Sequence, residues 1–185
     1  MDVIERAYID NKNLHEYLIS IKEVSYANVH SAQSAKNLLL SCASYFEVKM
    51  ISIIKDAMDA KECVLRDQFV YNQALLQKYH SLFNWKQKKA NDFFSKFGSN
   101  FNIFMKAKLQ ENPLLEQSIE DFLELGKLRN YLVHNDFLNY QLSLTDEEIF
   151  NKYKNALHFI EALPAFFQEF KVTMNSNRSV DTEED

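Results

Sequence analysis

Three side chains that lie close together in the sequence could bind an anion and move a proton. Asn130 directly follows Arg129, and His134 comes one helical turn after Asn130. A guanidinium can hold a phosphate group through two parallel hydrogen bonds, and an imidazole exchanges protons near neutral pH. The amide can orient the imidazole ring or donate to a phosphate oxygen. The trio would therefore suit phosphate binding with proton transfer beside it.

Arg129 occupies a position where a helix would be expected to carry an apolar residue. The residues three, four and seven positions away on the same helical face are all apolar: Phe122, Leu125, Leu132 and Val133. A desolvated guanidinium costs several kcal/mol unless it is paired or hydrogen-bonded. One explanation is a structural pair with Glu47, a charge that is equally misplaced in its own predicted helix. The other is a groove in which Arg129 holds phosphate.

A row of small and polar residues borders Arg129. Gly126, Asn130 and His134 follow one another at helical spacing, and Gly126 is one of only two glycines in the chain. A glycine inside a helix costs about 1 kcal/mol relative to alanine. We therefore expect Gly126 to mark the close approach of a second subunit or a substrate. The remaining histidines are interpreted as packing or capping residues: His15, His30, His80 and His158.

The elements that must position these residues are predicted to be helices. The 185 residues include two glycines and two prolines but 14% aromatics, which leaves little material for the tight turns of a sandwich or barrel. We predict an all-α helical bundle of five to seven helices around two long central helices. Residues 1–174 are expected to form a single domain, and residues 175–185 a disordered acidic tail.

Apolar periodicity and capping residues predict where the helices lie. The predicted helical segments are 3–24, 34–58, 64–83, two shorter helices within 83–109 that separate near Gly98, 111–137 and 145–170. Asn112 is a predicted N-cap with Pro113 at the first helical position, and Thr145 and Glu148 have the spacing of a capping box. A kink is expected at Pro164.

The second of these helices is predicted to be a buried central one. Its three-and-four spacing gives the expected buried row Leu40, Ala43, Glu47, Ile51, Ile54 and Met58. Glu47 is the only charge in that row, which is why it stands out as a partner for Arg129.

Charge and cysteine content exclude several classes of protein. The formal net charge is −5, but the segment 181–185 holds four acidic residues, so the body is close to neutral and has no broad basic face. Lys86, Lys88 and Lys89 form a local basic run that could guide an RNA backbone. The two cysteines have no metal-ligand or redox spacing, and we expect no metal and no cofactor. No apolar run approaches the roughly 20 residues that cross a bilayer, and no secretory signal is present, which favours a cytoplasmic location.

The arrangement of these segments resembles a known family. The segment "RNYLVH" resembles the R-x4-6-H motif of the HEPN superfamily, helical domains found in many RNA-cleaving toxins and defence proteins. The segments "SCASYFEVKM", "YHSLFNWKQKKANDFFSKFG" and "LGKLRNYLVHNDF" occur in the order typical of the RiboL-PSP type of HEPN domain. The resemblance covers the chain from about Ser31 to Phe170.

The resemblance implies a site and an activity. Arg129 and His134 match the arginine and histidine of the motif, and Asn130 matches its polar position. Glu47 would lie near them and brace Arg129. The family implies a homodimer whose motif helices face each other across a cleft, and metal-independent cleavage of an RNA substrate. The ribose 2′-OH would attack the phosphorus, His134 would transfer protons and Arg129 would stabilise the phosphorane.

Two functions remain open at this point. The first is an endoribonuclease of a toxin or antiviral-defence system, with an antitoxin or defence-system partner protein. The second is a non-catalytic HEPN module that dimerises or binds a nucleotide or partner, with Arg129 and Glu47 as a structural pair. In HEPN toxins paired with nucleotidyltransferase antitoxins, a tyrosine two residues after the histidine is modified. Asp136 stands there in this chain, so that mode of neutralisation is not expected.

Overall fold

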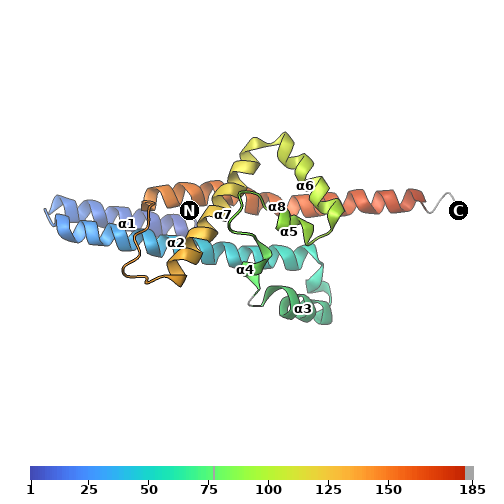
Figure 1. The fold of residues 1–185 in the computed structure, drawn as a ribbon, viewed down its shortest axis with the longest axis horizontal. Coiled ribbons are helices and arrows are strands. Elements are labelled where there is room, and N and C mark those ends of the chain that lie inside the picture. The colour runs from blue at the N-terminus through green and yellow to red at the C-terminus, as the bar shows by residue number, and fades with distance from the viewer. Residues whose placement is uncertain (77, 182–185) are drawn as a thin grey trace.

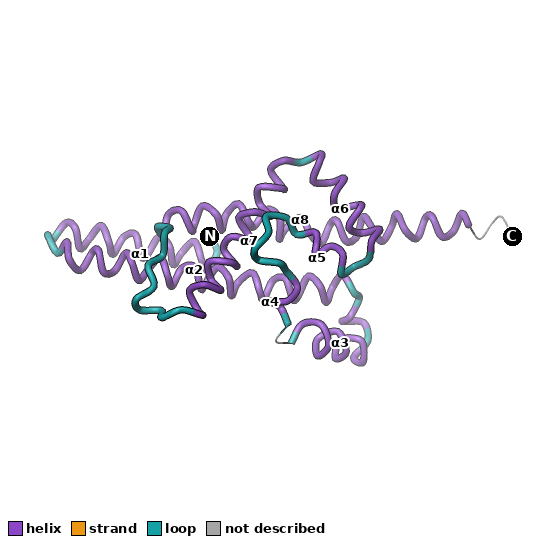
Figure 2. The backbone as a smooth tube through the Cα atoms, in the orientation of Figure 1, coloured by secondary structure: helices purple, strands orange, loops and turns teal. Residues whose placement is uncertain are grey.

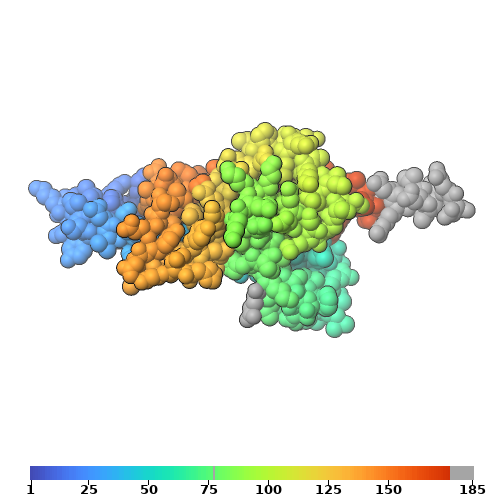
Figure 3. Space-filling model, in the orientation of Figure 1, coloured from blue at the N-terminus to red at the C-terminus, as the bar shows by residue number. Residues whose placement is uncertain are grey.

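The computed structural model describes residues 1–76 and 78–181, which form helices and loops without strands. Helix α1 (Val3–Ser20) begins at Asp2, whose carboxylate accepts hydrogen bonds from the backbone N–H groups of Ile4 and Glu5. It packs against α2 (Val24–Ala57), and the α1–α2 hairpin extends beyond the other elements at one end of the molecule (Figures 1 and 3).

Two further long helices form the centre of the core together with α2. Helix α7 (Pro113–His134) and helix α8 (Asp146–Asp181) pack against each other, and both pack against α2. Helices α2 and α8 run along the long axis of the molecule (Figure 1). Aromatic rings join the three helices: the Phe46 ring centroid lies 5.6 Å from that of Phe122 and 5.2 Å from that of Tyr153. The prediction of an all-α bundle around long central helices is therefore confirmed.

The buried row of α2 differs from the predicted one by a rotation of the helix. The buried residues include Leu39, Cys42, Phe46 and Met50. Of the predicted row, Ile54 is buried, Met58 is exposed, and the others are half-buried: Leu40, Ala43, Glu47 and Ile51. The two rows are adjacent on the helix, and each is apolar apart from Glu47, so spacing alone does not distinguish them. Glu47 is half-buried as a result.

The segment predicted as one helix over 64–83 is divided into shorter pieces. After a 3₁₀ turn (Ala60–Glu62) come α3 (Val64–Val70), a π-helical turn (Tyr71–Leu75) and α4 (Tyr79–Leu82). Val70 and Leu75 are both buried, and the wider π turn keeps two residues five positions apart on the same side. The described residues consequently contain eight α-helices rather than five to seven.

The local signals for helix ends are confirmed. Helix α5 (Asn91–Ser95) and helix α6 (Ser99–Glu111) separate at Gly98, whose φ of 101° favours glycine. Asn112 caps α7 by accepting from the backbone N–H of Leu115, with Pro113 at the first position. Thr145 and Glu148 form the predicted reciprocal capping box before α8. The loops between these helices are shown in Figure 2.

Helix α8 is longer than predicted. It continues across Pro164 and past residue 170 as far as Asp181, so residues 175–181 of the expected tail are helical. Residues 182–185 of that tail lie outside the described residues.

Helix α2 meets the length and composition criteria for a membrane-spanning helix, with a mean hydropathy of 1.3 over 18 residues. The expectation that no segment would do so was wrong. The core helix of a bundle meets the same criteria, and α2 buries Leu39, Cys42 and Phe46 in the core that it forms with α7 and α8. About 33% of that apolar window is buried, so packing in this fold accounts for part of its composition.

Candidate functional site

Helix α7 carries the motif residues on its last turns. Phe122, Leu125 and Leu132 are buried, which confirms most of the apolar face that surrounds Arg129. Val133 is 42% exposed, so the core ends before this side of the helix. Arg129 lies at that edge, half-buried, and one of its guanidinium N–H groups donates to the Asn130 side-chain oxygen at 3.2 Å. His134 is the last residue of α7 and is exposed. The helix thus presents a cation, an amide and an imidazole at the boundary between core and solvent.

The expected ion pair between Arg129 and Glu47 is not formed directly. Within the described residues, no carboxylate lies within ion-pair distance of Arg129. Glu47 is nevertheless close enough for its charge, like that of Arg129, to influence the pKa of Tyr79 and of His80. The guanidinium therefore keeps donors that are not used by a carboxylate.

His80 lies beside the motif residues, whereas its sequence position had suggested a packing or capping residue. His80 and Arg129 line the same small cavity, which has a volume of about 10 Å³, roughly that of a sphere the size of one water molecule. The buried Nδ1 atom of His80 has no hydrogen-bond partner among the described residues. Burial lowers the pKa of His80, and the charges of Arg129 and His134 lower it further, against an opposing effect of Glu47. The structure thus favours a neutral imidazole beside the guanidinium.

Gly126 is explained by a contact within the chain. A Cβ atom at this position would lie 2.0 Å and 2.2 Å from ring atoms of Trp85. The indole is held there because its Nε1–H donates to the backbone oxygen of His80 at 2.7 Å. The close neighbour that accounts for Gly126 is therefore Trp85 of the same chain, where the sequence had suggested a second subunit or a substrate. The contact places the segment that contains His80 and Trp85 directly against the motif helix.

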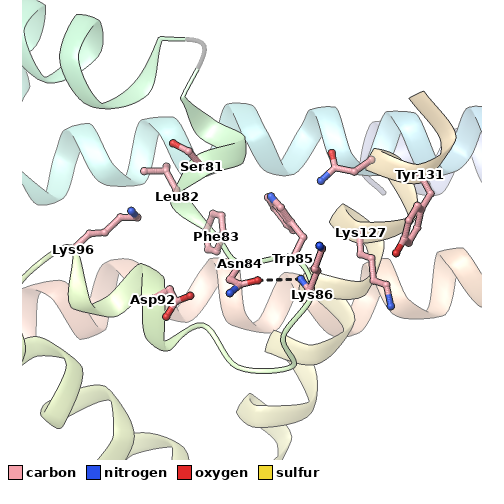
Figure 4. A pocket seen from close by; sticks show the side chains of 11 residues that line it. Ser81, Leu82, Phe83, Asn84, Trp85, Lys86, Asp92, Lys96, Lys127 and Tyr131 are labelled. Atoms are coloured by element: carbon pink, nitrogen blue, oxygen red, sulfur yellow. Dashed lines mark hydrogen bonds between the residues drawn. The ribbon is translucent and has the colours of Figure 1, made fainter. Parts of the chain in front are cut away.

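A cleft of about 760 Å³ opens beside this contact, between α7 and the segment 81–86. We call it the lysine cleft; it is lined by residues 81–86, Asp92, Lys96 and, from α7, Lys127, Asn130 and Tyr131. Figure 4 shows Lys96 and Lys127 on opposite sides of the cleft with Lys86 between them. Of the lysine run predicted to guide RNA, only Lys86 lines the cleft. Lys88 and Lys89 instead form ion pairs with Glu120 and Glu116 of α7.

A comparison with protein families identifies the fold. A model of the RiboL-PSP-HEPN family matches residues 6–169, from α1 through most of α8. The chain belongs to the RiboL-PSP-HEPN family. Comparison with curated proteins found no match, and comparison with solved structures found none either. Membership supports a role as an RNase or a nucleotide-binding module.

The HEPN domain holds the segment after His134 through a buried lysine of α2. Lys36 is 5% exposed, and its ammonium donates to the backbone oxygens of Phe137 at 2.7 Å and of Leu138 at 3.2 Å. The Asn135 side chain donates to the Tyr131 backbone oxygen at 2.6 Å and so closes the end of α7. Lys36 therefore fixes where the chain goes after the motif histidine.

Asp136 stands two residues after His134, in the loop that follows α7. Hydrogen bonds from the Asn139 side chain and from backbone N–H groups lower the pKa of this carboxyl group. Asp136 accepts from the Leu138 N–H at 3.1 Å and from the Asn139 amide at 2.6 Å. Within the described residues of the HEPN domain, no group of three or more His, Cys, Asp or Glu side chains is arranged to hold a metal ion.

Proposed function

We propose that this HEPN domain is a metal-independent endoribonuclease that cleaves RNA by attack of the ribose 2′-OH. One observation carries the proposal: the motif helix holds Arg129, Asn130 and His134 at the edge of the core, with Arg129 free of any carboxylate partner in the described chain. The family match supports the class of function.

The proposed reaction needs proton transfer and charge stabilisation. A base removes the proton of the 2′-OH, the 2′-oxygen bonds to phosphorus, and the bond from phosphorus to the 5′-oxygen breaks. The leaving 5′-oxygen receives a proton, so the products are a 2′,3′-cyclic phosphate and a 5′-OH. Because the nucleophile belongs to the RNA itself, the enzyme does not have to generate one.

Each motif residue has a role in this proposal. Arg129 stabilises the charge that develops on the phosphorane oxygens. Asn130 accepts a hydrogen bond from Arg129 and thereby orients the guanidinium. His134 transfers protons, since it is exposed at the end of α7 and within electrostatic reach of His80. The neutral His80 contributes an uncharged acceptor beside Arg129.

The proposal includes a homodimer with a composite active site. Two copies of His134 would supply one base and one acid for the two proton transfers. Val133, which directly precedes His134 in sequence, is 42% exposed and offers apolar surface to a second copy. We expect light scattering at micromolar concentration to give twice the 21.8 kDa chain mass. A monomeric mass would remove the composite-site mechanism.

We also propose that the protein is cytoplasmic. We further propose that it belongs to a toxin or antiviral-defence system and has an antitoxin or a defence-system protein as its partner. The rival function is a non-catalytic HEPN module that binds a nucleotide or partner. The lysine cleft supports binding in either case, so the products of the reaction must decide between the two.

The deciding experiment is cleavage of a mixed RNA pool in EDTA, with the new ends analysed chemically. We expect 2′,3′-cyclic phosphate ends from the wild type and from the control variant His158→Ala. His158 serves as the control because it lies in a separate pocket between α7 and α8. His134→Ala should give none. Equal products from wild type and His134→Ala would reject the assignment, and so would 5′-phosphate ends.

A further inference from the structure

The lysine cleft gathers positive charge beside the motif. Its lining includes the ammonium groups of Lys86, Lys96 and Lys127 and a single carboxylate, that of Asp92. All three lysine side chains are exposed at the rim. The chain as a whole is acidic, so this local excess of positive charge is a property of the cleft rather than of the surface in general.

These three lysines differ from their neighbours in having no carboxylate partner in the described part of the chain. Lys88 pairs with Glu120 and Lys89 with Glu116, while Lys61 pairs with Asp56. Lys127 is placed over the ring of Tyr131, 5.9 Å from its centroid, and forms no ion pair. The ammonium groups in the cleft therefore remain available to an anion from outside the chain.

The acidic residues next to the cleft pair with lysines outside its lining. Lys86 and Lys127 also border an adjacent hollow that contains Glu120 and Glu124. Glu120 pairs with Lys88, and Glu124 pairs with Lys152 at 2.7 Å. Neither carboxylate is within ion-pair distance of the cleft lysines, so the electrostatic attraction for an anion is preserved.

The cleft also offers groups that suit nucleobases. Tyr131 is 45% exposed, and its ring can stack on a base, a contact that does not depend on base identity. Asn84 and Asn130 provide amides at the lining, and Asn130 is the residue that accepts from Arg129. The cleft is thus continuous with the proposed catalytic residues through one side chain.

We propose that the lysine cleft binds single-stranded RNA and leads the strand to Arg129 and His134. The assignment of RNA, rather than another polyanion, rests on the proposed function. Lys86, Lys96 and Lys127 contact backbone phosphates, and Tyr131 stacks on an unpaired base. A duplex would keep its bases in the helical stack and could not offer one to Tyr131. The volume of the cleft, about 760 Å³, lies within the range of about 300–1,000 Å³ that is typical of ligand pockets.

The test is binding of a fluorescent single-stranded RNA of mixed sequence, measured by anisotropy in a His134→Ala background so that cleavage does not interfere. One variant carries Lys86→Gln, Lys96→Gln and Lys127→Gln. The matched control carries Lys61→Gln, Lys88→Gln and Lys89→Gln, which removes the same charge from exposed lysines that have carboxylate partners. Circular dichroism melting of both variants establishes that each is folded.

We expect the cleft variant to bind at least about tenfold more weakly and the control to bind like the parent protein. The negative slope of log K against log salt should become shallower by about 2 in the cleft variant, because each phosphate contact on a single strand contributes about −0.7. Tyr131→Ala should weaken binding roughly fivefold or more. Equal weakening by both triple variants would overturn the proposal, and so would equal competition by duplex RNA.

This result is separable from that of the cleavage assay. A protein that binds RNA through the cleft but produces no cyclic ends would refute the proposed activity and leave the binding site intact. A protein that cleaves RNA, but whose triple cleft variant binds as well as the parent, would refute the binding site alone.

Discussion

Replacing Gly126 by alanine should destabilise the fold, although alanine favours a helix. The new Cβ would meet ring atoms of Trp85 at 2.0, 2.2 and 2.8 Å, far inside van der Waals contact. The rigid indole is tied by its hydrogen bond to the His80 backbone oxygen, so it cannot rotate away without losing that bond. Overpacking costs about 1–3 kcal/mol, and this contact belongs at the upper end. Subtracting a helix-propensity gain of about 1 kcal/mol leaves a net loss of about 2 kcal/mol.

Thermal unfolding followed by circular dichroism measures this effect. For a chain of this length, about 2 kcal/mol corresponds to a fall in Tm of about 4 to 8 °C. The control is the same substitution in a Trp85→Ala background, where the clash is absent and Gly126→Ala should raise Tm by the helix-propensity gain. The predicted effect therefore changes sign with the presence of the indole. A Gly126→Ala protein as stable as wild type, or the same sign in both backgrounds, would refute the packing argument.

Three further substitutions have defined outcomes. Arg129→Ala should abolish RNA cleavage but change the unfolding free energy measured in urea by about 1 kcal/mol or less, because the substitution leaves no carboxylate without its ion-pair partner. A loss of about 3 kcal/mol would indicate a structural pair. Burial and the charge of Arg129 lower the pKa of His80, so the folded state binds the proton less tightly and becomes less stable as the pH drops below about 6.5. Between pH 7 and pH 5 the Tm of His80→Gln should therefore decline less than that of the wild type. Parallel Tm curves for the two proteins would contradict this. Lys152→Met removes the cation that pairs with the carboxylate of Asp121, which is 3% exposed, and should lower the unfolding free energy measured in urea by about 3 kcal/mol. Glu124, an exposed residue, pairs with the same lysine, and Glu124→Gln should lower it by less than about 1 kcal/mol.

The features that could be predicted from the sequence are those set by neighbours in the chain. The caps at Asn112 and Thr145 depend on residues within one turn, and the break at Gly98 depends on a single backbone conformation. The grouping of Arg129 with Asn130 is equally local, since the two side chains hydrogen-bond to each other. Such signals are present in any short window of sequence and need no knowledge of packing.

The features that could not be predicted depend on contacts between distant segments. His80 reaches the motif because Trp85 packs on Gly126, and neither spacing nor composition encodes that contact. The glycine itself was a signal of close approach, but the identity of the neighbour lay in another part of the chain. The orientation of α2 was missed for a related reason, because two adjacent rows of that helix are apolar and only the packing against α7 and α8 selects one.

The anchor formed by Lys36 has a consequence for how this part of the chain can diverge among homologues. Its ammonium group is bound by the backbone oxygens of Phe137 and Leu138, and a backbone oxygen is the same whichever side chain is attached to it. The loop between α7 and α8 can therefore exchange Leu138, which is 73% exposed, without loosening the end of the motif helix. The surface next to His134 can thus vary, while a single residue on α2 keeps the course of the chain after the motif helix.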